Sequence, residues 1–387
     1  MSKLEIDGPR ACTKAELPEV IALVDSALGR AGTGQTLLTD YPLVYEDENL
    51  ENVRILRVNG ELASVVPFIP WPVVMDGCRF TVCIISPTAT AVPHRKKGYG
   101  LRCLDDCIER MEAMGCEISI LRTKVETFPF YGSGDYQGVR NQAWVYRCTR
   151  EDAKLFADHG EELALYDPAT RRHLDAIQAM HDREKTGVRR SASRYPGLFS
   201  LPKMKTLLAL RDRLPVAYLL VSRAVNMPGL VEAGGDEAAV ETLVHRALAE
   251  LGEADAQNAH ANLTESVLGN LLERKLPGRR QPTSENRMVR INRPSAFLFE
   301  IAREVERRNQ GVEKTFSLTV GGETIGFEFT KSGLKLGKTK LDLHFELSRR
   351  ELVSAVFGAH PSYPADAAVG LGGSLAYYFP ICLLDRS

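Results

Sequence analysis

Residues 92–101 read Val92-Pro93-His94-Arg95-Lys96-Lys97-Gly98-Tyr99-Gly100-Leu101, so that three cations stand directly before two glycines spaced one residue apart. Residues 80–85 and 88–92, which precede the cations, are apolar or small and rich in β-formers, which predicts a strand. After the turn, apolar residues recur at three- and four-residue steps on one face of a predicted helix, namely Leu101, Leu104, Ile108, Met111 and Met114. Gly115 suits the end of this helix, and residues 117–121 predict the next strand. The order is therefore strand, basic glycine turn, helix, strand.

A turn of this composition is suited to hold a pyrophosphate. A helix start leaves backbone N–H groups without intrahelical partners, and the helix dipole makes that end positive. Glycine lets a phosphate approach the backbone closely, and cations are unfavourable at a helix start unless an anion binds there. A solvated basic loop is the alternative. A P-loop is absent, and Cys103 stands where a dinucleotide fingerprint needs its third glycine.

The spacing Arg95-x-x-Gly98-x-Gly100 resembles motif A of the GCN5-related N-acetyltransferases (GNAT), whose pattern is Arg/Gln-x-x-Gly-x-Gly/Ala. In that family the backbone amides of the motif hold the pyrophosphate of acetyl-CoA, which is a co-substrate. The resemblance implies that the turn binds acetyl-CoA through Arg95, Lys96, Lys97, Gly98, Tyr99 and Gly100. It also implies that the strand before the turn holds the pantetheine arm through Thr88, Ala89 and Thr90.

The family also places a tyrosine on a later helix, usually in a Tyr-x-x-x-Gly-Phe/Tyr setting, where it protonates the departing CoA thiolate. The stretch Phe130-Tyr131-Gly132-Ser133-Gly134-Asp135-Tyr136 is similar, and the resemblance implies this catalytic role for Tyr131. Asp135 stands where glycine is usual and Gly134 comes one residue early, so the local turn is expected to be remodelled. The alternative is an ordinary aromatic side chain between core and surface.

The 387 residues exceed one typical core and predict two or three domains. Residues 1–150 read as helix, antiparallel strands with an Asn59-Gly60 hairpin, motif turn, helix and strand. Residues 151–287 repeat this order without the Arg-x-x-Gly-x-Gly motif, which predicts a degenerate second copy. Residues 288–387 read as a helix, hairpins and a short helix capped by Ser348 and Glu351, and they resemble a sterol-carrier-like domain.

The predicted fold class is therefore α/β (α+β), with two tandem GNAT-like mixed-sheet domains followed by a sterol-carrier-like α+β domain. By architecture this resembles the Eis-like acetyltransferase branch. In that branch the C-terminal carboxylate of the chain enters the active site and serves the amine, which implies the same role for Ser387; a frayed tail is the alternative. The acidic cluster Asp40, Glu46, Asp47 and Glu48 is a second candidate for attracting a cationic amine, with a solvated loop as its alternative.

Composition narrows the class of protein. A formal net charge of −1 argues against a general binder of nucleic acid or anionic membranes. No apolar run is long enough to span a bilayer and no secretory signal is evident, so a cytoplasmic location is expected. The eight cysteines are scattered and do not indicate a disulfide framework. Cys103 and Cys107 lie four apart on the predicted helix but are expected to be buried thiols, and no metal site is predicted.

These features predict an acetyl-CoA-dependent N-acetyltransferase that acts on a primary amine of a small molecule or an exposed lysine. Direct attack in a ternary complex is expected, because no activated Cys or Ser nucleophile is evident. The alternative is a non-catalytic CoA-sensing or lipid-binding protein that uses the C-terminal domain. A homo-oligomer is possible by analogy with ring-forming relatives. The identity of the acceptor amine stays open.

Overall fold

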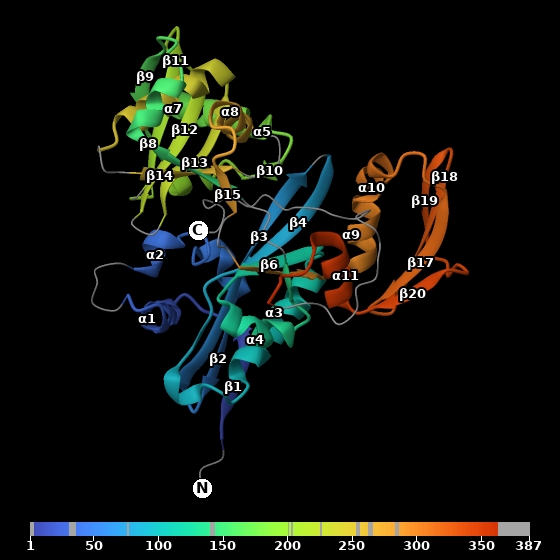
Figure 1. The fold of residues 1–387 in the computed structure, drawn as a ribbon. Coiled ribbons are helices and arrows are strands. Elements are labelled where there is room, and N and C mark those ends of the chain that lie inside the picture. Colours follow the sequence, from blue (N-terminus) through green and yellow to red (C-terminus); the bar gives the residue numbers. More distant parts are fainter. Residues whose placement is uncertain are drawn as a thin grey trace. The chain divides into compact units, whose positions relative to one another are not determined.

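The computed structural model describes residues 4–30, 36–75, 77–139, 144–199, 201–202, 204–224, 227–252, 256–261, 266–282 and 286–362 (Figure 1). Within them the chain forms two compact units. The first unit combines residues up to 141 with residues from 285 onward, and the second consists of residues 142–284.

The first unit is built on one mixed sheet with the strand order β1-β2-β3-β4-β6-β16-β7. Its strands are β1 (Ile6–Ala11), β2 (Val53–Val58), β3 (Glu61–Met75), β4 (Cys78–Ile85), β6 (Ile118–Arg122), β7 (Gln137–Val139) and β16 (Arg287–Ile291), and a short strand β5 (Ala89–Thr90) pairs with β3. The predicted hairpin is confirmed: Asn59 and Gly60 both have positive φ (50° and 84°) between β2 and β3, as a tight hairpin turn requires.

Strands β4 and β6 are parallel, and helix α3 (Tyr99–Ala113) makes the crossover that such a pair needs. Its buried face includes Cys103, Leu104, Cys107, Ile108 and Met111, as the periodicity predicts. The first helix starts later than predicted. It was expected to begin at Lys14, after Thr13, but it is α1 (Leu17–Ala27), because Glu16 is the N-cap and Pro18 fits the first turn. A short helix α2 (Leu37–Asp40) follows.

The C-terminal part of the first unit carries a second, smaller sheet with the order β19-β18-β17-β20. Its elements are α9 (Pro294–Glu300), α10 (Ala302–Arg308), β17 (Lys314–Val320), β18 (Glu323–Thr330), β19 (Gly333–Gly337), β20 (His344–Leu347) and α11 (Arg349–Phe357). The predicted capping box of Ser348 and Glu351 is present at the start of α11. Helix α9 contacts β4 and β18, and α11 contacts β16 and β20, so these helices lie between the two sheets (Figure 1).

The second unit has a sheet with the order β15-β8-β14-β13-β12-β11-β9 and its own hydrophobic core. Its elements are β8 (Trp144–Thr149), β9 (Glu162–Leu165), α5 (Arg171–Asp182), β10 (Gly187–Val188), α6 (Tyr195–Phe199), β11 (Met204–Arg211), β12 (Leu214–Ala224), β13 (Met227–Gly235), α7 (Glu237–Ala249), β14 (Ala256–Ala261), α8 (Val267–Lys275) and β15 (Arg280–Pro282). Strands β13 and β14 are parallel with α7 between them, which repeats the β4–α3–β6 arrangement of the first unit.

Two antiparallel ladders stand where the chain passes between the units. β7 pairs with β16 (Val139↔Arg287), and β8 pairs with β15 (Trp144↔Pro282). The chain leaves the first unit after β7 and returns to it at β16, so the second unit is an insertion in the sequence of the first. The first and last strands of the second unit, β8 and β15, pair with each other. The three-domain division stays a prediction, but this pairing puts residues 144–149 in the second sheet and residues 287–291 in the first.

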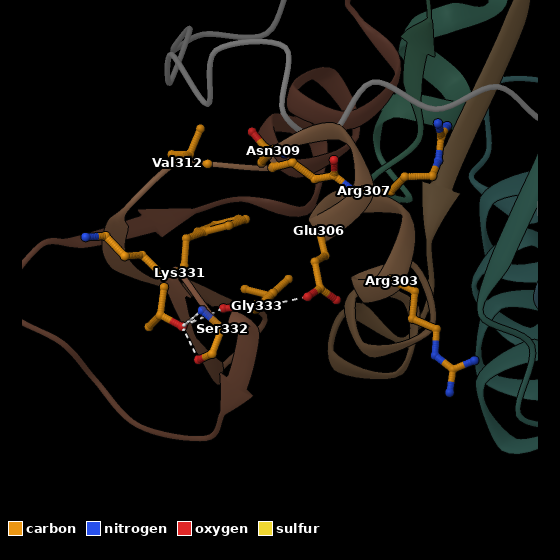
Figure 2. A pocket seen from close by; sticks show the side chains of 13 residues that line it. Arg303, Glu306, Arg307, Asn309, Val312, Lys331, Ser332 and Gly333 are labelled. Atoms are coloured by element: carbon orange, nitrogen blue, oxygen red, sulfur yellow. Dashed lines mark hydrogen bonds between the residues drawn. The ribbon is translucent and has the colours of Figure 1, made fainter.

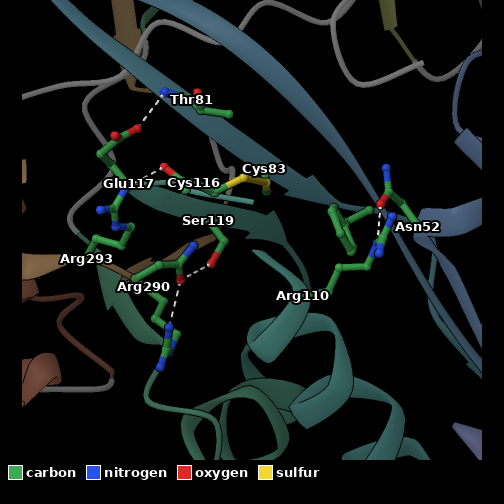
Figure 3. Close-up of a disulfide and its surroundings, with 12 residues drawn as sticks. Asn52, Thr81, Cys83, Arg110, Cys116, Glu117, Ser119, Arg290 and Arg293 are labelled. Atoms are coloured by element: carbon green, nitrogen blue, oxygen red, sulfur yellow. Dashed lines mark hydrogen bonds between the residues drawn. A yellow bond between two sulfur atoms is a disulfide. The ribbon is translucent and has the colours of Figure 1, made fainter. Parts of the chain in front are cut away.

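The scattered cysteines were not expected to form a disulfide framework, but two of them are joined. Cys83 of β4 and Cys116, just before β6, form a disulfide with their Cα atoms 6.6 Å apart (Figure 3). Cys103 and Cys107 are buried free thiols, as predicted. None of the helices in the described ranges has the length and apolar character that a bilayer span requires.

Candidate functional site

Strand β4 loses its pairing with β6 at the level of the candidate site. The β4–β6 pairs end at Ile85↔Leu121, and the chain then continues as β5, which pairs with β3. The Ala91 N–H donates to the Ala63 carbonyl (2.9 Å), so strand alternation turns the N–H and carbonyl of Thr90 away from β3. Arg95 Nε donates to that carbonyl at 3.1 Å. The backbone of β5 thus presents polar groups on the side that faces away from β3.

The basic turn lies directly after β5 and its cations are exposed. Arg95, Lys96, Lys97 and Gly98 are exposed, whereas Tyr99 and Gly100 are buried. Neither Lys96 nor Lys97 has an acidic partner in the part of the chain that the structure describes. Gly98 is the N-cap of α3, with φ 81° and no side-chain cap. The first N–H groups of α3, beginning with that of Tyr99, therefore face the turn without intrahelical acceptors.

Gly100 marks a close approach of three elements. A Cβ atom at this position would lie 3.0 Å from Thr90 Oγ1 of β5 and 3.4 Å from the ring of Phe130. Phe130 belongs to α4 (Phe128–Gly132), the short helix after β6. The second glycine of the motif thus lets α3 pack against both β5 and α4, and brings the turn beside Tyr131.

Tyr131 of α4 is 8% exposed and packs edge-on against Phe130, with ring centroids 4.8 Å apart. Burial raises the pKa of Tyr131, and the neighbouring Thr88 hydroxyl partly opposes this shift. The phenol therefore stays protonated at neutral pH and is able to donate a proton. Thr88, the residue directly before β5, is thus a neighbour of Tyr131 in α4.

The turn after α4 keeps its usual backbone conformation although Asp135 stands where glycine is usual. Asp135 has φ 65°, the left-handed conformation that glycine usually supplies at this position of a helix end. Gly134 instead fits a tight space, because a Cβ there would lie 2.9 Å from Ile108 of α3. Aspartate tolerates the left-handed region better than most residues, so no different backbone is needed at position 135.

A series of linked, buried polar side chains near α4 was not predicted from the sequence. The Tyr136 hydroxyl lies 2.6 Å from Ser119 Oγ, which donates to Asn292 Oδ1 (3.0 Å). Arg290 Nη1 donates to the same oxygen (2.8 Å) and lies 2.9 Å from the Glu112 carboxylate (Figure 3). This chain connects β6, α3 and β16. An arginine within the apolar run of residues 288–291 is the sequence signal that would have indicated it.

Two of the four carboxylates predicted to attract an amine form ion pairs with basic side chains. Asp40 pairs with Arg30 (2.8 Å) and Asp47 pairs with Lys14. These two carboxylates therefore already have counter-charges. Ser387 lies outside the described residues. The last described segment docks on β7: Ala359 bridges to Val139, and the His360 ring packs edge-on against Phe128 of α4, 5.3 Å away.

The equivalent turn of the second unit has the opposite chemistry. Helix α7 begins after Asp236, whose carboxylate accepts a hydrogen bond from the Ala239 N–H (3.0 Å), and Glu237 adds a second acidic group. Here a side chain of the protein already caps the helix start, and arginines already pair with both carboxylates, Arg211 with Asp236 (3.7 Å) and Arg274 with Glu237. The arrangement does not suit a phosphate. Among the described residues there is also no group of three or more His, Cys, Asp or Glu side chains placed to hold a metal ion.

Comparison with known proteins places this geometry in a class. Residues 9–138 match the family model of the acetyltransferase (GNAT) domain. These residues carry the turn, β5 and Tyr131, so the candidate site lies within a GNAT acetyltransferase domain. A search of curated proteins finds no match to the chain.

Solved structures of similar size share the fold. A GCN5-related N-acetyltransferase from Anabaena variabilis superposes with a TM-score of 0.68 at 13% identity, covering 98% of this chain and 99% of that one. A probable N-acyltransferase from Enterococcus faecalis gives 0.67 at 15% identity, with 93% and 91% covered. Eis1 from Mycobacterium abscessus gives 0.60 at 14% identity, with 97% and 98% covered. At these identities the likeness concerns the fold.

Proposed function

We propose that this protein is an N-acetyltransferase that transfers the acetyl group of acetyl-CoA to a primary amine of a small molecule or a lysine. The observation that carries the proposal is the start of α3. There an uncapped helix end, exposed cations that no described acidic side chain pairs with, and the polar edge of β5 lie together within the GNAT domain. The proposed degenerate copy in the second unit lacks all of these features at α7.

The residues present fit an acyl-CoA. The N–H groups at the start of α3 and the side chains of Arg95, Lys96 and Lys97 would hold the pyrophosphate, because an unfilled helix start with a positive dipole favours an anion. The backbone N–H and carbonyl groups of Thr88, Ala89 and Thr90 would hold the pantetheine arm, without a contribution from their side chains. When bound, acetyl-CoA supplies the thioester that the amine attacks.

Direct attack in a ternary complex agrees with the state of the thiols. Burial raises the pKa of Cys12 to about 11 and that of Cys103 to about 12, so neither is a thiolate nucleophile at neutral pH. Tyr131, protonated and beside β5, would give its proton to the departing sulfur. The carboxylate of Ser387 would receive the proton of the amine; residues 359–360, which lie against β7 near α4, are the nearest described part of that segment.

The alternative, a lipid-binding role for the C-terminal part, finds less support. A hollow there lies between α10 and the β18–β19 turn (Figure 2). Its lining includes the charged side chains Arg303, Glu306, Arg307 and Lys331. A lipid tail requires apolar walls, so this hollow does not suit one. The sterol-carrier-like assignment and a homo-oligomer stay predictions.

A screen of amines with acetyl-CoA, read out as thiol release, tests the proposal. We expect release with at least one class among aminoglycosides, polyamines, peptides and free lysine. Arg95→Ala should lower kcat/KM for acetyl-CoA by about tenfold or more, because a charge-assisted contact to phosphate is lost. Arg211→Ala, which removes an exposed arginine of the second unit, is the matched control. Thiol release that is independent of the amine, or equal in Arg95→Ala, would contradict the proposal.

A further inference from the structure

Thr88 carries a buried hydroxyl that has no hydrogen-bond partner among the described residues. It lies in the short segment between β4 and β5, after the β4–β6 pairing has ended. Thr90, two residues further along, differs, because its hydroxyl lies 2.9 Å from Ser64 Oγ. Buried polar groups in proteins are nearly always hydrogen-bonded, so an exception beside a catalytic candidate points to a role in function.

The geometry explains why Thr88 and Tyr131 are neighbours. Gly100 of α3 lies against both Thr90 and Phe130, so β5, which directly follows Thr88, and α4, which carries Tyr131, converge over this glycine. The Thr88 hydroxyl lies beside the phenol without forming a hydrogen bond of good geometry in this state. This hydroxyl lowers the pKa of Tyr131 against the larger effect of burial, which raises it.

The other groups that face Tyr131 are neutral. The Cys107 thiol of α3 contributes to the raised pKa of Tyr131. The Tyr136 ring packs edge-on against the Tyr131 ring, with centroids 6.1 Å apart. Burial raises the pKa of both Cys107 and Tyr136 well above their ordinary values. Of these neighbours, Thr88 is the one with a hydroxyl that is not already engaged, since the Tyr136 hydroxyl bonds with Ser119.

We propose that Thr88 is a positioning residue for Tyr131, and that its hydroxyl donates a hydrogen bond to the phenol oxygen as Tyr131 gives up its proton. The inference rests on the proposed function. In that reaction the amine nitrogen bonds to the thioester carbon, the C–S bond breaks, and the proton of Tyr131 passes to the departing sulfur. The proton released by the amine nitrogen later restores the phenol, so the net products are an amide and a thiol.

The physical reason is the charge left behind. When Tyr131 donates its proton, its oxygen becomes negative in a buried site, where an unpaired charge is unfavourable. A donor aimed at the atom on which charge develops stabilises the transition state more than the ground state. The Thr88 hydroxyl is suited to this because no other described group competes for it.

Kinetics of Thr88→Val test the inference, with Thr88→Ser as the conservative variant. We expect Thr88→Val to lower kcat by about tenfold or more and leave KM for acetyl-CoA unchanged, and Thr88→Ser to restore most of kcat. In a Tyr131→Phe background, Thr88→Val should add no further loss. Unchanged kcat, a rise in KM alone, or a fully additive loss would overturn the inference.

A spectroscopic titration separates this inference from the proposed function, because it needs no turnover. The ultraviolet difference between the wild type and Tyr131→Phe reports ionisation of Tyr131 as pH rises. We expect Thr88→Val to shift this ionisation to higher pH, while Ser133→Ala, which removes an exposed hydroxyl of the same helix end, leaves it in place. An unshifted ionisation in Thr88→Val overturns the inference. Absence of turnover with every amine, together with a shifted ionisation, would overturn the proposed function alone.

Discussion

The N–H of Tyr136 donates a hydrogen bond to the carbonyl of Tyr131 at 3.2 Å, which closes the end of the helix that carries the proposed acid. The Asp135 N–H adds a bond to the Gly132 carbonyl at 3.1 Å. Together they form the double closure of a helix C-terminus that needs a left-handed residue between its two donors. Asp135 supplies that residue, so the position of Tyr131 depends on one aspartate in an uncommon conformation.

Substitutions at Asp135 should therefore change stability in opposite directions. We expect Asp135→Gly to maintain or raise the free energy of unfolding, and Asp135→Ala to lower it by about 1 kcal/mol, because alanine tolerates the left-handed region poorly. Asp135→Asn, which keeps the shape and removes the charge, is the control and should stay close to the wild type. Urea denaturation measures all three. An alanine variant as stable as the glycine variant would show that this backbone conformation is not a constraint.

The buried polar side chains linked to Tyr136 predict that removing the hydroxyl of Tyr136 and that of Tyr45 changes the free energy of unfolding differently. Tyr136→Phe removes a hydroxyl that bonds with Ser119 and should lower the free energy of unfolding by about 1 kcal/mol. Tyr45→Phe removes a hydroxyl that is buried without a partner in the described part of the chain, so it should be neutral or stabilising. Paired denaturation curves test this. Equal losses in the two variants would contradict the assignment of the polar chain.

The second unit is expected to fold by itself. Its core residues lie between Tyr146 and Leu276, and its first and last strands pair with each other. A fragment of residues 142–284 should therefore unfold cooperatively when followed by circular dichroism. It should not bind acetyl-CoA, because Asp236 caps α7 where Gly98 leaves α3 open. Binding by the fragment would contradict the view that the second copy is degenerate.

The sequence predicts the local elements of this chain well and their partners less well. The Asn59-Gly60 hairpin and the apolar face of α3 follow from turn chemistry and from helical periodicity, both of which act within a few residues. Strand β16 could not be assigned to the first sheet, because its partners β6 and β7 precede it by more than a hundred positions and nothing local specifies them.

In the candidate site, too, the local features could be predicted from the sequence and the long-range contacts could not. The turn at residues 95–100 and the exposure of its cations follow from local composition. The partners of the acidic stretch do not, since Lys14 and Arg30 come from distant positions. The buried Thr88 hydroxyl beside Tyr131 also depends on tertiary packing, because α4 reaches β5 through the space that Gly100 leaves open.

The pH dependence of turnover should report Tyr131. Its protonated form is the active one, and burial raises its pKa above the ordinary value of roughly 10. The acid therefore stays competent through neutral pH, and kcat should fall only as pH rises through that raised pKa. Tyr131→Phe should lower kcat by about a hundredfold and abolish this alkaline limb. Retention of the limb in Tyr131→Phe would assign the acid to another group.

Calorimetric titration with acetyl-CoA of the wild type, Gly98→Asp and Gly98→Asn tests the central claim most directly. Asparagine and aspartate tolerate the left-handed conformation of Gly98 about equally, so they differ in one negative charge at the start of α3. If this turn holds the pyrophosphate, the wild type binds at micromolar concentration, Gly98→Asn binds more weakly, and Gly98→Asp does not bind. Equal affinity in the aspartate and asparagine variants would contradict the claim.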